Sequence, residues 1–268
     1  MLLIEQFQSI GDNFRQLVSV ISYYLPRVSA FMLFFPLFTR GFAGNFIKLS
    51  VGTALVLMPA YLSMEVYRAS VNPPALGLLT FLSEVTLGGL LGMIIGLPYF
   101  AFKDVGALID VYRGATFAAQ ATGTDSGEEL PTETLFGLLF CAIILAGPGL
   151  HAITVHLLNS FLLFPPGTLQ ADTLGTWLPS LLRLLADHIT FAVLISGPIL
   201  IAILVVEILV EIVSAFAQQL QVYSLQFALR SVFGIFFLIV LLTFAEEDIF
   251  RLFQIYSEGL QTLLGGMQ

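Results

Sequence analysis

Long apolar runs separated by short polar connections dominate this sequence. A helix needs about 20 apolar residues to cross the hydrocarbon core of a bilayer, and six runs reach or approach that length. They span residues 17–38, 46–62, 76–102, 135–164, 189–213 and, shorter, 227–244. The pattern predicts an all-α, polytopic membrane protein with about six long hydrophobic helices.

The connections between these runs predict several broken or re-entrant helices. Pro73 and Pro74 stop one segment, and Pro165-Pro166-Gly167 ends another, because proline cannot continue a helix. Residues 174–188 read either as an interfacial or re-entrant helix or as the start of the fifth long helix. The tail 246–264 has apolar residues at helical spacing and predicts an amphipathic helix. Without a repeat or soluble linker, residues 1–268 are predicted to form a single all-helical domain.

Residues 113–133 form a small, polar run between two of the most apolar segments. Their backbone groups would lack hydrogen-bond partners in lipid. The run is therefore expected to sit in water, to line a cavity or to pack inside an assembly.

Composition agrees with a membrane protein and narrows its function. The 268 residues are 57% hydrophobic and only 10% charged, whereas soluble domains carry about 25% charged residues. A net charge of −8 argues against a nucleic-acid partner. The single cysteine, Cys141, excludes an internal disulfide. Acidic residues come before any basic residue at the N-terminus, which is unlike a signal peptide. Hydrolase and nucleotide-binding motifs are missing, so neither an enzyme nor a cofactor site is expected.

Charged residues inside apolar runs are candidates for polar contacts. Arg27, Glu84, Glu207 and Glu211 each lie in a predicted helix, where a charge is costly without a partner or water. Glu207 and Glu211 share a helix face. They indicate either a proton or cation site or a polar seam towards neighbouring subunits or lipid headgroups, and the seam is favoured.

Other spacings indicate packing or local pairing. Gly88, Gly92 and Gly96 lie on one helix face and favour close helix contact. His151 and His156 are five residues apart and point in different directions, so shared metal ligation is disfavoured. Asp110 and Arg113 have the spacing of a helical ion pair, although their position beside the polar run keeps a gating role open.

Several blocks, in order, resemble one family. They are Leu25-Pro26-Arg27-Val28-Ser29-Ala30 with Phe35-Pro36-Leu37-Phe38, Glu84-Val85 with the glycine run 88–96, Gly106-Ala107-Leu108-Ile109-Asp110 with Arg113-Gly114 and Phe117-Ala118, Gly149-Leu150-His151 with Ser160-Phe161 and Pro165-Pro166-Gly167, and Gln219-Leu220-Gln221-Val222 with Arg230-Ser231. Together they are similar to the FliR / SctT family, the T-type component of bacterial flagellar and type III secretion export machinery. The chain departs from the family pattern where Thr124-Asp125-Ser126 lacks a proline and where Arg230 replaces a lysine.

The resemblance implies an inner-membrane, multi-pass protein that assembles with R-, S- and U-type export proteins. With the R- and S-type subunits it would form the entrance channel for unfolded secreted substrates. The family's T subunit is similar to an R-type and an S-type subunit fused in one chain, which here assigns 1–185 and 186–268 to the two parts. The divergent loop and Arg230-Ser231 favour the injectisome over the flagellum.

The resemblance also implies that the polar run plugs the closed pore. The residues expected in this plug are Arg113, Gly114, Phe117, Ala118, Gln120, Thr122, Gly123, Thr124 and Asp125. Contacts between subunits are expected at Arg27, Glu207, Glu211, Gln218, Gln219 and Arg230.

Two other functions remain open. A stand-alone secondary transporter would use Glu207 and Glu211, with Arg27 or Arg113 as counter-charge. An assembly scaffold would hold the apparatus together without touching the pore.

Overall fold

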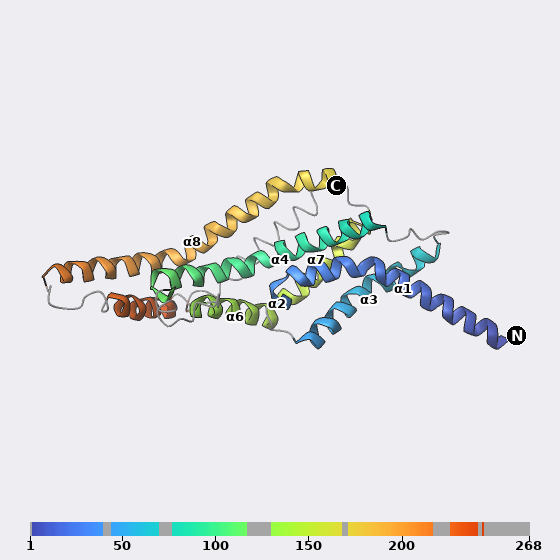
Figure 1. Cartoon of the computed structure of the whole chain (residues 1–268), viewed down its shortest axis with the longest axis horizontal. Coiled ribbons are helices and arrows are strands. Elements are labelled where there is room, and N and C mark those ends of the chain that lie inside the picture. The colour runs from blue at the N-terminus through green and yellow to red at the C-terminus, as the bar shows by residue number, and fades with distance from the viewer. Residues whose placement is uncertain are drawn as a thin grey trace. The chain divides into compact units, whose positions relative to one another are not determined.

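The computed structural model describes residues 2–39, 44–69, 77–116, 130–167, 171–216, 226–240 and 243. Within these residues the chain is helical, and the predicted all-α fold of a polytopic membrane protein is confirmed (Figure 1). The helices are α1 (Leu2–Phe34), α2 (Pro36–Thr39), α3 (Asn45–Ala69), α4 (Leu78–Tyr112), α6 (Pro131–Ala146), α7 (Gly149–Leu163), α8 (Ala171–Phe216) and the unlabelled helix Gln226–Val240.

Two helices are long and apolar enough to cross a membrane, namely α4 and the Trp177–Phe216 part of α8. A third span results if α6 and α7, which are separated at Gly147-Pro148, count as one broken span. In the described residues the six predicted runs fall on helices, although the run 135–164 is divided between α6 and α7. Three runs correspond to shorter apolar helices: Val18–Phe34, Phe46–Tyr61 and Gln226–Val240. Residues 174–188 belong to the continuous helix α8, so they are the start of the fifth long helix.

The chain divides into two units, and neither is a continuous stretch of sequence. Among the described residues, unit 1 comprises those in the ranges 2–96 and 147–179, and unit 2 comprises those in the ranges 97–146 and 180–243. These boundaries differ from the predicted division at residue 185. The relation of 1–185 and 186–268 to R- and S-type subunits stays a prediction.

Unit 1 is built around α1, which packs against α2 and α3, while α3 also contacts α7. Its aromatic core includes Phe31 and Phe35, whose rings stack with centroids 5.4 Å apart. Helix α1 ends at Phe34 because Pro36 disfavours a helical conformation at the residue before it. Phe164, just after α7, packs edge-on against Trp177 of α8, with ring centroids 5.5 Å apart.

In unit 2, Phe102 of α4 is the centre of an aromatic cluster. Its ring lies 5.4 Å from Phe136 and 6.1 Å from Phe140, both on α6, and 5.9 Å from Phe191 on α8. Helices α4 and α6 approach closely at Gly106, where a Cβ atom would lie 2.5 Å from the Thr132 carbonyl oxygen. This contact brings the end of α4 beside the start of α6.

Candidate functional site

The carboxylate of Asp110 connects the two flanks of the polar run. It lies near the end of α4 and is fully buried. Its Oδ1 accepts a hydrogen bond from Arg113 Nε at 2.7 Å, on the side where the run begins. Its Oδ2 accepts the backbone N–H groups of Thr132 and Glu133 at 2.8 and 3.0 Å, on the side where the run ends. One side chain therefore binds residues on both sides of the segment 117–129.

Asp110 caps α6 from another helix. The first N–H groups of a helix have no partner within it and favour a negative charge, and here Asp110 supplies that charge. Pro131 occupies the first turn, where its missing N–H costs nothing. Glu133 adds a second carboxylate, which accepts the Leu130 N–H at 3.3 Å and pairs with the Lys103 ammonium at 2.7 Å.

Gly114 ends α4 with a turn that few other residues could form. Its φ is +82°, which lies in the left-handed region that glycine adopts without strain. A Cβ atom at this position would lie 2.8 Å from the ring of Phe227, on the helix Gln226–Val240. The start of the polar run is thus held by its backbone turn and by a ring from a third helix of unit 2.

The structure describes only the first of the predicted plug residues, Arg113 and Gly114. The others lie outside the described residues: Phe117, Ala118, Gln120, Thr122, Gly123, Thr124 and Asp125. The plug itself stays a prediction.

A second buried charge cluster lies inside unit 1. Arg27 of α1 and Glu84 of α4 are both fully buried, and Arg27 Nε donates to Glu84 Oε2 at 2.7 Å. The guanidinium also donates to the carbonyl oxygens of Ser160 and Phe164, each at 2.8 Å. Glu84 Oε1 accepts the Gly167 N–H at 3.1 Å. These contacts enclose the Arg27 guanidinium within unit 1, and the expected contact of Arg27 with other subunits stays a prediction.

Gly88 and Gly92 face the backbone of α1. A Cβ atom on Gly88 would lie 2.2 Å from the Arg27 carbonyl oxygen, and one on Gly92 would lie 2.7 Å from that of Phe31. Only glycine permits this approach, which brings Glu84 within reach of Arg27. Gly96, the third member of the predicted packing face, is buried.

The carboxylates of α8 have partners on the helix Gln226–Val240. Arg230 pairs with Glu207, and Gln226 Nε2 donates to Glu211 Oε1 at 3.2 Å. The Glu207 side chain retains 35% of its accessible surface, so it can still meet a neighbour. Contacts of Glu207, Glu211 and Arg230 with other subunits stay predictions, and Gln218 and Gln219 lie outside the described residues.

The histidines do not form a metal centre in the part of the chain that the structure describes. No group of three or more His, Cys, Asp or Glu side chains there is placed to hold a metal. His188 Nε2 instead lies 2.8 Å from Asp104 Oδ2, which links α8 to α4 in unit 2.

Sequence reasoning missed the partners that complete both clusters. Thr132, Glu133 and Lys103 were not singled out as partners around Asp110. Ser160 and Gly167 were named only for the family resemblance, not as partners of Arg27 and Glu84. A signal existed for the first set, since Pro131 followed by Glu133 is typical of a helix start. The second set gave no local signal because its members contribute backbone atoms.

Comparison with known proteins agrees with this architecture. Residues 18–255 match the model of the family "Bacterial export proteins, family 1". The chain belongs to this family. The membership confirms the resemblance to the FliR / SctT family, and the chain is accordingly a membrane component of a bacterial protein-secretion system.

Three relatives illustrate the range of similarity. The chain is 22% identical to "Yop proteins translocation protein T" of Yersinia pestis over 86% of this chain and 88% of the relative. It is 25% identical to "Surface presentation of antigens protein SpaR" of Salmonella typhimurium over 92% of both chains. It is 30% identical to "Secretion system apparatus protein SsaT" of the same organism over 63% of this chain and 64% of the relative.

Proposed function

We propose that this bacterial export protein is the T-type component of a type III secretion export gate in the inner membrane. With R- and S-type subunits, and beside a U-type protein, it forms the entrance channel for unfolded substrates. Its segment 113–125 plugs the pore at rest. The protein acts by forming and closing a passage, not by catalysis.

The observation that carries the proposal is the double attachment at Asp110. The buried carboxylate holds Arg113 before the polar segment and the N–H groups of Thr132 and Glu133 after it. A segment attached at both ends to the same point can obstruct an opening and be displaced without unfolding its supporting helices. Such a hinge needs end residues that keep their geometry, and the turn at Gly114 provides one.

The composition of the segment suits a reversible seal. Ala118, Thr122 and Thr124 are small and weakly polar, so they can close a passage without binding a substrate strongly. Gly123 permits a change of backbone conformation, and Phe117 can act as an apolar stopper. A seal of this kind excludes small solutes while no substrate is present.

The exposed apolar faces favour assembly with partner subunits. Large side chains of α8 remain exposed, among them Leu194 at 67%, Ile201 at 64% and Phe216 at 87%. Exposed apolar side chains in such number are covered by lipid or by other proteins. We infer that Glu207, Glu211, Gln218, Gln219 and Arg230 supply polar contacts within these subunit interfaces.

The secondary-transporter alternative is less well supported. It needs Arg27 or Arg113 as a counter-charge for Glu207 and Glu211. Arg27 is occupied by Glu84, and Arg113 is occupied by Asp110. The charge near Glu207 comes from Arg230 instead, which makes an ordinary structural pair.

Deleting residues 116–125 in cells that produce the complete apparatus tests the plug. We expect entry of a small membrane-impermeant solute, with wild-type levels of the protein in the membrane. As a control, a Gly/Ser segment of equal length in place of 116–125 separates loss of the seal from shortening of the connection, and it should leak too. A tight membrane with normal secretion by the deletion variant would overturn the proposal.

A further inference from the structure

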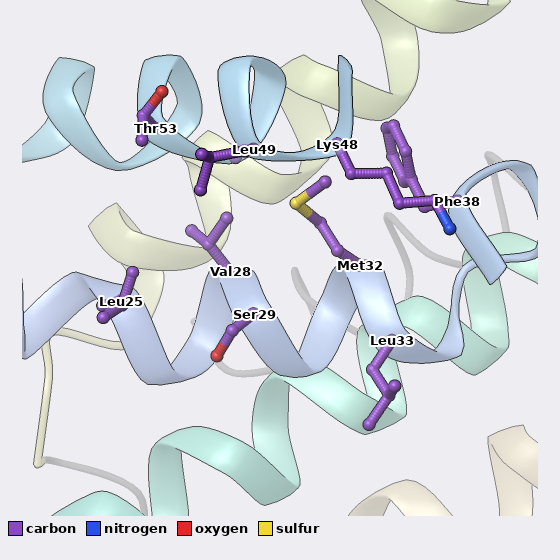
Figure 2. A pocket seen from close by; sticks show the side chains of 10 residues that line it. Leu25, Val28, Ser29, Met32, Leu33, Phe38, Lys48, Leu49 and Thr53 are labelled. Carbon is purple, nitrogen blue, oxygen red and sulfur yellow. The ribbon is translucent and has the colours of Figure 1, made fainter. Parts of the chain in front are cut away.

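A groove lies between α1 and α3 in unit 1. It encloses about 520 Å³, within the range of about 300–1,000 Å³ that is usual for small-ligand sites. Figure 2 shows Val28 and Met32 of α1 facing Leu49 of α3 across this space. Most of its lining side chains are aliphatic, which suits an acyl chain better than a rigid or polar ligand.

The groove has one charged end. Of the described residues that line it, Lys48 alone carries a charge. Its side chain extends towards Phe38 at one end, while Leu25 lies at the other (Figure 2). Lys48 forms no ion pair with any carboxylate in the described part of the chain. Its charge is therefore available to an anion, in a protein whose net charge is −8.

Lys48 lies near one end of an apolar helix, where a lysine can reach lipid headgroups. It is near the start of the apolar helix Phe46–Tyr61, where a lysine can reach the membrane surface while its stem stays in apolar surroundings. From there the groove follows α1 from Leu33 back to Leu25, about 12 Å at 1.5 Å per residue. It thus runs from a cation near a helix end towards the interior of an apolar helix pair.

The hydroxyl groups in the groove do not require a polar ligand, because each already donates a hydrogen bond. Ser29 Oγ donates to the Pro26 carbonyl, and Thr53 Oγ1 donates to the Ser50 carbonyl. Both donors are used within their own helices, so among the described residues that line the groove the Lys48 ammonium is the one strong polar group. An elongated apolar chain with one anionic end satisfies this arrangement, and a polar peptide backbone does not.

We propose that the α1–α3 groove binds one anionic phospholipid of the surrounding membrane. An acyl chain lies between Val28, Met32 and Leu49, and the phosphate contacts Lys48. The proposal is independent of the plug, because neither the polar run nor Asp110 takes part.

Photolabelling in defined vesicles tests this assignment on the full chain, purified together with its co-expressed export partners. The protein is placed in phosphatidylcholine vesicles that contain a trace of one photoreactive lipid probe. The anionic probe is phosphatidylglycerol and the neutral probe is phosphatidylcholine, each with a diazirine on one acyl chain. We expect the anionic probe to label peptides containing Met32 and Leu49 about fivefold more than the neutral one, as one lysine near a membrane surface supports. Peptides around Leu194 on α8 should show no such preference.

Four variants separate the headgroup contact from the acyl-chain contact. Lys48→Gln should abolish the preference for the anionic probe, whereas Lys48→Arg should keep it. Thr53→Phe fills the groove from an exposed position and should lower labelling by both probes. Arg183→Gln removes an exposed cation on α8, outside the groove, and should change nothing.

Three results would overturn the proposal. The first is equal labelling of the wild type by the two probes, and the second is a preference that survives Lys48→Gln. The third is a crosslink from a photoreactive residue at position 49 to a protein in place of lipid. That result would assign the groove to a partner subunit.

Discussion

Helix α4 carries two buried carboxylates that have the same kinds of partner but different consequences. Glu84 and Asp110 are both fully buried, both pair with an arginine and both accept backbone N–H groups next to a helix end. Glu84 joins Arg27 and Gly167, which are far apart in sequence. Asp110 joins the two flanks of a single polar segment. The same chemistry therefore stabilises the fold in unit 1 and fixes the ends of a candidate gate in unit 2.

The arginines differ in the same way. Arg27 is 0% exposed, and its remaining donors bind the last carbonyl groups of α7. Arg113 retains 11% of its side-chain surface and comes from the same turn of helix as Asp110. A buried ion pair is costly to break because a lone charge stays behind. We therefore expect disruption at Glu84 to affect folding and disruption at Asp110 to affect gating.

Glu84→Ala should have the largest effect. It leaves the Arg27 guanidinium buried without a counter-charge, at a cost of about 3–5 kcal/mol. We expect a strong drop in the amount of folded protein in the membrane and in its thermal stability in detergent. Glu207→Gln, at a pair that is partly exposed, is the control and should change stability by about 1 kcal/mol or less.

A double variant sharpens this prediction. Replacing both charges, as Arg27→Met with Glu84→Leu, removes the uncompensated guanidinium and should restore part of the lost stability. If the double variant is no more stable than Glu84→Ala, the ion pair does not dominate the stability of unit 1.

Asp110→Asn should have an intermediate effect on stability and a specific effect on closure. The asparagine amide has one acceptor oxygen in place of two, so it cannot accept hydrogen bonds both from Arg113 and from the two α6 N–H groups. Hydrogen bonds to a charged group are each worth about 1.5–3 kcal/mol. We expect a protein that still inserts and assembles but lets a small solute through the membrane. Asp104→Asn, which alters the partly exposed His188 contact, is the matched control and should stay tight.

If Asp110→Asn instead lowers assembly as strongly as Glu84→Ala, without leakage, the two carboxylates play the same structural role. The contrast between the two units would then be lost.

Gly114→Ala should have the smallest of these effects. A side chain in the left-handed region costs about 1–2 kcal/mol, and here it also meets the Phe227 ring. We expect a modest fall in thermal stability together with a measurable leak. Gly175→Ala, on α8 with no other part of the chain within 4 Å of the added carbon, is the control and should be neutral or slightly stabilising. Equal behaviour of the two variants would show that the turn at Gly114 is dispensable.

The fold was largely predictable because hydrophobicity determines where helices lie in a membrane. All six apolar runs fall on helices, and the break at Gly147-Pro148 follows from proline chemistry. The continuity of α8 was harder to predict, because Pro179 and Pro198 lie within it. Arg183, Asp187 and His188 also suggested an interfacial or re-entrant segment, but these residues lie within the continuous helix α8.

The candidate site was predictable only where its contacts are local. The Asp110–Arg113 pair followed from a spacing of three residues. The contacts from Asp110 to Thr132 and Glu133, and from Arg27 to Glu84, join residues 22, 23 and 57 positions apart. Such contacts depend on how helices pack, which hydrophobic periodicity does not specify. The partner of Glu84 was therefore open, and Arg27 was assigned to a subunit interface.

Crosslinking of a stalled substrate measures directly whether the polar segment lines the export path. A photoreactive residue at Gln120 is introduced into the complete apparatus while a substrate with a folded, export-blocking domain occupies the channel. We predict a crosslink between position 120 and the stalled substrate, and none when the same residue replaces Leu194 on α8. A secreting apparatus with no substrate crosslink at position 120 would contradict the assignment of this segment to the pore.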